Sequence, residues 1–145
     1  MSKFLMLFVA VILMSCKPEP REIDYGLDAC HYCKMNIVDA KYASELVTKK
    51  GKIYTYDAIE CLINNLGEHP ESTVAYTLIK DYGNPEEWVD ATQAFYVVNA
   101  KIQSPMGGNL AGFLTADNAQ ITLSVSKDSL LNWEYIKTKN FVFDE

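Results

Sequence analysis

The sequence is poor in histidine and has no cluster of basic residues. Only two histidines occur among 145 residues, and the lysines and arginines are scattered along a chain whose formal net charge is −6. Nucleic-acid-binding proteins share a basic patch or stripe, so this composition argues against a nucleic-acid partner. The sequence also contains no nucleophile elbow, no His-Glu zinc pair of the helical kind and no phosphate-binding loop. Nothing in it therefore indicates hydrolase chemistry.

A long hydrophobic run is also missing, except at the start of the chain. Residues 4–14 are apolar throughout and follow Lys3. A membrane-spanning helix needs about 20 such residues, so this shorter run is typical of a signal peptide. The run ends in Leu-Met-Ser-Cys, which resembles the lipobox of bacterial lipoproteins. The resemblance implies a signal peptide over residues 1–15 and a lipid on the thiol of Cys16; an uncleaved N-terminal anchor is the alternative.

The rest of the chain divides into a short linker and one globular body. Residues 16–26 are mostly polar and contain two prolines, so we predict a flexible tether there. In the whole chain 49% of the residues are hydrophobic and 22% are charged, which is ordinary for a globular protein. Residues 27–145 are therefore predicted to form one folded body, exported and attached to a membrane surface through the lipid.

The first half of this body has the pattern strand, strand, helix, strand. Strands rich in β-branched and aromatic residues are predicted over residues 42–48, 53–56 and 72–82. Asp57 is predicted to cap a helix, with Glu60 completing a capping box three residues later. Apolar residues then recur at helical spacing as far as Leu66.

The second half repeats this pattern less clearly after a Gly-Asn-Pro break at residues 83–85. Strands are predicted over residues 92–100 and 110–114, followed by a helix with Thr115 as its cap and by a terminal helix over residues 132–139. Residues 119–126 are β-branched enough to favour a strand by propensity, but the repeat favours the helix. We therefore predict an α+β fold of two small related ββαβ lobes packed together, over residues 27–84 and 85–145.

Three cysteines remain after Cys16, and their odd number weakens a purely structural disulfide account. A disulfide between Cys30 and Cys33 with Cys61 left free stays open. A redox dithiol requires the Cys-x-x-Cys pair at the start of a helix that follows a strand, whereas this pair follows the tether. A zinc site usually needs a second pair of ligands, which is absent.

The methionines favour a different metal. Met35 and Met106 are the only methionines after residue 16, and both lie in polar, loop-like surroundings. Thioethers and thiolates are soft ligands that suit Cu(I). Met35 follows Cys33 by two residues, so an extended segment would point both side chains the same way. Met106 precedes two glycines, which would let its backbone approach another segment closely.

Several stretches together resemble the NosL-type lipoproteins, accessory copper chaperones of nitrous oxide reductase. These stretches are the lipobox, residues 30–62, Trp88 with residues 90–98, and residues 104–119. The resemblance implies a Cu(I) carrier that is not an enzyme and that is anchored in the bacterial cell envelope, facing the periplasm. Its partner would be apo nitrous oxide reductase or the membrane assembly complex of that enzyme.

The resemblance also implies which residues hold the metal. The ligands it gives are Cys33, Met35 and Met106. Additional metal ligands or disulfide partners would be Cys30, His31 and Cys61. A periplasmic thiol/disulfide redox protein that uses Cys30 and Cys33 remains the alternative function.

Overall fold

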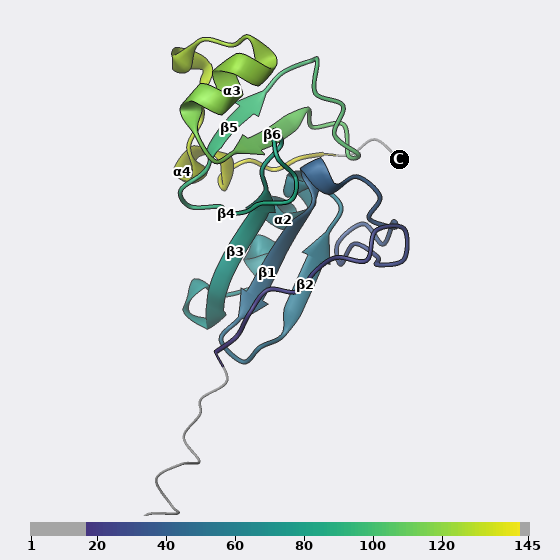
Figure 1. Cartoon of the computed structure of the whole chain (residues 1–145). Coiled ribbons are helices and arrows are strands. Elements are labelled where there is room, and N and C mark those ends of the chain that lie inside the picture. Colours follow the sequence, from purple (N-terminus) through teal and green to yellow (C-terminus); the bar gives the residue numbers. More distant parts are fainter. Residues whose placement is uncertain (1–16, 143–145) are drawn as a thin grey trace, which may run out of the picture.

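The computed structural model describes residues 17–142, and Figure 1 shows how their elements are arranged. The predicted signal peptide and the predicted lipid-bearing Cys16 lie outside the described residues. A four-stranded sheet forms the lower part of the molecule in Figure 1, and a two-stranded sheet with a helix on top of it forms the upper part. The predicted α+β class is confirmed.

The larger sheet is antiparallel throughout and has the strand order β2-β1-β3-β4. Its strands are β1 (Ser44–Thr48), β2 (Ile53–Tyr56), β3 (Val74–Lys80) and β4 (Trp88–Asp90). The first three confirm the predicted strands: β2 has the predicted bounds, and β1 and β3 are shorter than predicted. β1 begins two residues later than predicted because Ala40–Tyr42 form a 3-10 turn capped by the Asp39 side chain. β4 pairs with β3, so a segment from beyond residue 84 completes the first sheet.

Helix α2 (Ile59–Asn65) packs against this sheet, but the predicted capping box is wrong. The residue at the N-cap position is Ala58, which makes no side-chain capping bond. Asp57 is 2% exposed and Glu60 is fully buried. Both carboxyl groups are enclosed in the body of the protein. The two residues have the spacing of a capping box but do not cap the helix.

The upper part consists of β5 (Phe95–Val98), β6 (Leu110–Phe113) and α3 (Ala116–Leu123). The helix prediction for α3 is confirmed, and the Thr115 side chain accepts a hydrogen bond from the Asn118 N–H at 3.1 Å, as an N-cap should. The predicted terminal helix is confirmed in a shorter form as α4 (Trp133–Ile136). Short 3-10 turns occupy Leu66–Glu68, Glu71–Thr73 and Lys127–Ser129.

The second half only partly repeats the first. Where the first half has a third strand, the second has an isolated bridge between Tyr96 and Leu131, with two hydrogen bonds of 2.9 and 2.8 Å. The order strand, strand, helix is thus shared by both halves, and the last strand of the second half is reduced to a single pairing.

The two sheets are joined by close packing and by hydrogen bonds. Gly112 on β6 lies against Ile79 on β3, and the carbonyl of Gly112 accepts a bond from the Tyr82 N–H at 2.9 Å. Asp81 is 1% exposed, and its Oδ2 accepts a bond from the Leu114 N–H at 2.7 Å. Tyr96 of the upper sheet belongs to the same buried cluster as Ile79. The loops of one sheet are therefore held in fixed positions against the other.

The segment predicted as a tether makes contacts with the body near its end. Ile23 is 5% exposed, and the Arg21 N–H donates to Glu45 Oε1 at 3.1 Å. The Arg21 guanidinium pairs with Asp28 at 2.6 Å. Part of the chain before residue 27 therefore covers the buried strand β1.

Within residues 17–142, no helix combines the length and the apolar character that crossing a membrane requires.

Candidate metal centre

The first two cysteines lie on a tight turn before the large sheet. The N–H of Cys30 donates to the Met35 carbonyl at 2.8 Å, and Lys34 has a positive φ of 66°. The His31 N–H donates to the Thr55 carbonyl at 2.8 Å, which ties the turn to β2. The expectation of an extended segment that points Cys33 and Met35 the same way is therefore wrong. The left-handed residue between them reverses the chain.

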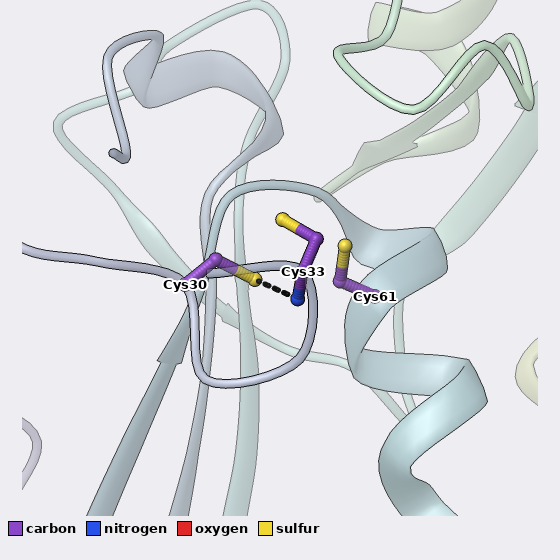
Figure 2. A group of neighbouring side chains, drawn as sticks. All are labelled: Cys30, Cys33 and Cys61. Carbon is purple, nitrogen blue, oxygen red and sulfur yellow. Dashed lines mark hydrogen bonds between the residues drawn. The ribbon is translucent and has the colours of Figure 1, made fainter. Parts of the chain in front are cut away.

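The third cysteine comes from a different element. Cys61 lies in the first turn of α2 and is fully buried, as is Cys30 with 1% exposure, whereas Cys33 is half-buried. The three sulfur atoms lie within 4.8 Å of one another. Figure 2 shows the turn presenting Cys30 and Cys33 opposite the helix that carries Cys61, with the Cys33 N–H donating to Cys30 Sγ at 3.5 Å.

The spacing of the sulfurs suits a single metal ion. All three thiols are free. Metal–thiolate bonds are about 2.3 Å long, so two sulfurs on opposite sides of one ion lie about 4.6 Å apart and three sulfurs around one ion lie about 4.0 Å apart. Separations of at most 4.8 Å therefore require only a small inward movement of the sulfurs. The trio can hold one soft ion close to the surface, because Cys33 is the member that solvent reaches.

The three thiols differ in acidity. The S–H of Cys61 donates to Cys30, and the backbone N–H groups of Asp57 and Cys33 add to this, so the pKa of Cys30 falls to about 5. The pKa of Cys61 is raised, chiefly because its proton is held in that bond, and the pKa of Cys33 is raised, chiefly by burial. Of the three thiols, Cys30 is thus the one whose surroundings favour the thiolate, and a metal that binds the other two sulfurs as thiolates must displace their protons.

The two methionines lie in unlike surroundings. Met35 is 45% exposed. Met106 is partly buried and packs against the hydrophobic cluster that contains Cys30 and Cys61 and that Cys33 also contacts. Met106 therefore contacts the large buried cluster to which the cysteines also belong, although its loop starts from the upper sheet.

His31 joins a second group of potential ligands. Ligand atoms of His31, Glu68 and His69 lie within 4.8 Å of one another. The ring of Tyr54 contacts both imidazoles, with centroids 4.6 and 4.4 Å away. Burial lowers the pKa of His31, which favours the neutral ring. Two imidazoles and a carboxylate are donors for divalent ions of intermediate softness, so this group differs in chemistry from the thiols.

No local pattern in the sequence places Cys61 at the site. Its helical position lies just off the apolar stripe of α2, which also fits an ordinary core residue. The one signal in the sequence was the odd number of cysteines. His69, which loop position alone would leave in solvent, is half-buried, and its Nε2 lies 3.1 Å from Asn65 Oδ1.

Comparisons with known proteins identify the family of the chain and a similar fold. The family model for NosL matches residues 22–140. Among solved structures, the chain is similar to the copper chaperone NosL from Shewanella denitrificans, with a TM-score of 0.65 and 20% sequence identity over 81% of this chain and 94% of that one. Among curated proteins, none matches the sequence. The family match spans the cysteine turn, α2 and the Met106 loop, and the chain belongs to the NosL family.

Proposed function

We propose that this protein is a Cu(I) carrier of the bacterial cell envelope that delivers copper to an exported copper enzyme, most directly nitrous oxide reductase. The observation that carries the proposal is a cluster of three free thiols in a chain of the NosL family. Two of them lie on the turn, where Cys33 is partly exposed, and the third lies on α2. The copper chaperone from Shewanella denitrificans, which has a similar fold, supports copper as the cargo.

The donor chemistry supports a soft, monovalent ion. Cys33 is the thiol that an incoming ion meets first, because Cys30 and Cys61 are buried behind it. In the proposed site, the thioethers of Met35 and Met106 complete the coordination of an ion on Cys33. Thiolate and thioether ligands select Cu(I) over harder cations. A site on a surface turn also lets a partner replace the ligands one at a time, as a carrier requires.

A thiol/disulfide redox protein is the competing function. The acidic thiolate of Cys30, with a pKa of about 5, favours it. However, Cys30 is 1% exposed, and a thiolate attacks a partner's disulfide only when it can reach it. The more exposed thiol is Cys33, whose pKa is raised. The thiol that a partner can reach is thus not the acidic one, which is unfavourable for disulfide exchange. This arrangement favours metal binding.

An anaerobic titration of residues 17–145 with Cu(I) tests the binding. We expect one Cu(I) per chain, and a large loss of affinity in the Met35→Ala and Met106→Ala variants because each removes a soft ligand. A protein that binds no Cu(I) but reduces or exchanges disulfides in model substrates would contradict the carrier function and support the redox alternative.

Delivery is tested in cells that contain the chain and its proposed recipient. Strains that carry Cys33→Ser or Met106→Ala should produce nitrous oxide reductase with too little copper under copper limitation, at unchanged protein level. The measurement is the copper content and activity of the purified reductase. A fully loaded enzyme in these strains would refute delivery.

The membrane attachment depends on Cys16. We expect Cys16→Ala to release the protein from membranes or to leave its signal peptide uncleaved, because the lipid would have no thiol to join. Membrane fractionation and the mass of the N-terminal peptide measure this, with Ser15→Ala as the control that keeps the thiol. Normal processing and membrane attachment of Cys16→Ala would contradict lipidation.

A further inference from the structure

Met106 sits on a loop that leaves the upper sheet and returns to it, and a single buried carboxylate fastens this loop to α2. We infer that Glu60 is a positioning residue that holds the Met106 loop beside the cysteine cluster. The inference rests on the proposed function, since it assigns Glu60 a part in copper binding through Met106.

The attachment is made by hydrogen bonds at the base of the loop. Glu60 Oε1 accepts a short bond from the hydroxyl of Ser104, which is 7% exposed. The same Ser104 oxygen accepts the Asn109 N–H at 2.9 Å, and the Ser104 carbonyl accepts the Gly107 N–H at 2.9 Å. Ser104 therefore holds together the two ends of the segment that contains Met106. Its bond to Glu60 attaches this segment to α2.

The backbone of the loop also touches Glu60 directly. A Cβ atom on Gly108 would lie 2.6 Å from Glu60 Cγ and Oε1 and 2.9 Å from the Phe141 ring. Gly107 has a φ of +74° and Asn109 a φ of +55°, so left-handed residues lie on either side of this contact. Only glycine lets the loop approach α2 this closely, which means that the loop is shaped to fit against Glu60.

Glu60 also stands next to a member of the thiol cluster. It precedes Cys61 in the first turn of α2, so one rigid helical turn carries both the thiol and the attachment of the methionine loop. The loop that carries Met106 is thus attached to the helical turn that carries Cys61.

Stability alone does not account for a carboxyl group at this position. Glu60 is fully buried, and its Oε2 has no hydrogen-bond partner. A buried polar atom without a partner costs free energy, so this carboxyl group is kept at a cost that its bond to Ser104 offsets only in part. Through the Ser104 bond, Glu60 fixes the position of the loop, which an apolar side chain could not do by hydrogen bonding.

Positioning matters because methionine is a flexible ligand. Its side chain has three rotatable bonds, so Met106 on a loose loop would have to be ordered each time copper binds. Groups that orient metal ligands without touching the metal typically contribute 10–100-fold to affinity. We expect a loss of about that size in Cu(I) affinity when Glu60 is replaced by Ala.

The test follows the NMR signal of the Met106 methyl group when Cu(I) is added. Residues 17–145 contain Met35 and Met106 as their only methionines, so ¹³C-methyl labelling gives two NMR signals. In the wild type the Met106 signal should shift on Cu(I) addition. In Glu60→Ala this shift should shrink and the affinity, measured against a Cu(I) chelator, should fall. Glu60→Gln keeps an acceptor for the Ser104 hydroxyl and should restore both. Glu71→Ala, on a side chain 94% exposed, is the control and should change neither.

The outcomes separate the inference from the function on which it rests. A folded Glu60→Ala protein with wild-type affinity and an unchanged Met106 shift would overturn the positioning role. If Glu60→Ala does not fold, Ser104→Ala removes the same bond and is read by the same two measurements. A wild-type protein that binds Cu(I) without a shift at Met106 would overturn the ligand set and this inference together. A wild-type protein that binds no Cu(I) would overturn the proposed function itself.

Discussion

Replacing Cys33 by serine is expected to lower the affinity for Cu(I) by about 100-fold or more, because changes that only disturb the support of metal ligands already cost 10–100-fold. Cys33 is the one cysteine of the cluster that is both within reach of two other sulfurs and partly open to solvent. Serine keeps the size of the side chain nearly unchanged but replaces a soft sulfur with a hard oxygen. Competition with a chelator of known Cu(I) affinity measures the loss.

Two further variants make this result specific. Cys61→Ser should have a smaller effect, since Cys61 is buried and contacts Cys30 through a hydrogen bond. Val38→Ala, on a nearby side chain that is 67% exposed, should bind Cu(I) as the wild type does. Equal affinity for the wild type and Cys33→Ser would show that Cu(I) binds elsewhere on the chain.

Adding one methyl group at Gly112 is expected to reduce the free energy of unfolding by about 1–3 kcal/mol, the usual cost of overpacking a core. Gly112 lies on β6 where the upper sheet meets β3, and a Cβ atom there would overlap the Cδ1 atom of Ile79. The same Cβ would stand 3.3 Å from Ile59 Cδ1, so neither side has free space. Urea unfolding of Gly112→Ala measures the change.

A double variant tests whether this contact is the cause. Ile79→Val removes the Cδ1 atom that the new methyl group would meet, and alone it should cost about 0.5–1.5 kcal/mol. Combined with Gly112→Ala, it should cost less than the sum of the two single changes, because the added methyl group fills the space left by Cδ1. Strictly additive effects would place the origin of the destabilisation elsewhere. As a control, Gly67→Ala, where nothing lies within 4 Å of an added Cβ, should leave the packing undisturbed.

The order of elements could be predicted because its signals are local. β-branched and aromatic residues over 72–82 predicted β3. Thr115 predicted the start of α3, and its side chain accepts a hydrogen bond from the N–H three residues later. These features depend on neighbours within a few positions, which the sequence lists directly. The residue types of a soft-metal site were also readable, since sulfur ligands are rare enough to stand out.

The capping box at Asp57 and Glu60 failed because the same spacing has two explanations. In an isolated helix these carboxyl groups would bond to free N–H groups at its start. Here α2 enters the body at that end, so Asp57 is enclosed and Glu60 meets Ser104, 44 residues away along the chain. A partner so distant in sequence leaves no periodic signal.

Local patterns in the sequence were enough to predict the α+β class, the order strand, strand, helix in each half, and the presence of thiols and thioethers suited to Cu(I). They did not predict β4 or the loss of the last strand in the second half. Only the tertiary structure decided that Cys61 stands with Cys30 and Cys33, that His31 joins Glu68 and His69, and that the Met106 loop rests on Glu60. The physical reason is that a binding site depends on which surfaces of α2, the cysteine turn and the upper sheet pack together. Packing follows the burial of many side chains at once, whereas local patterns follow the chain only a few residues at a time.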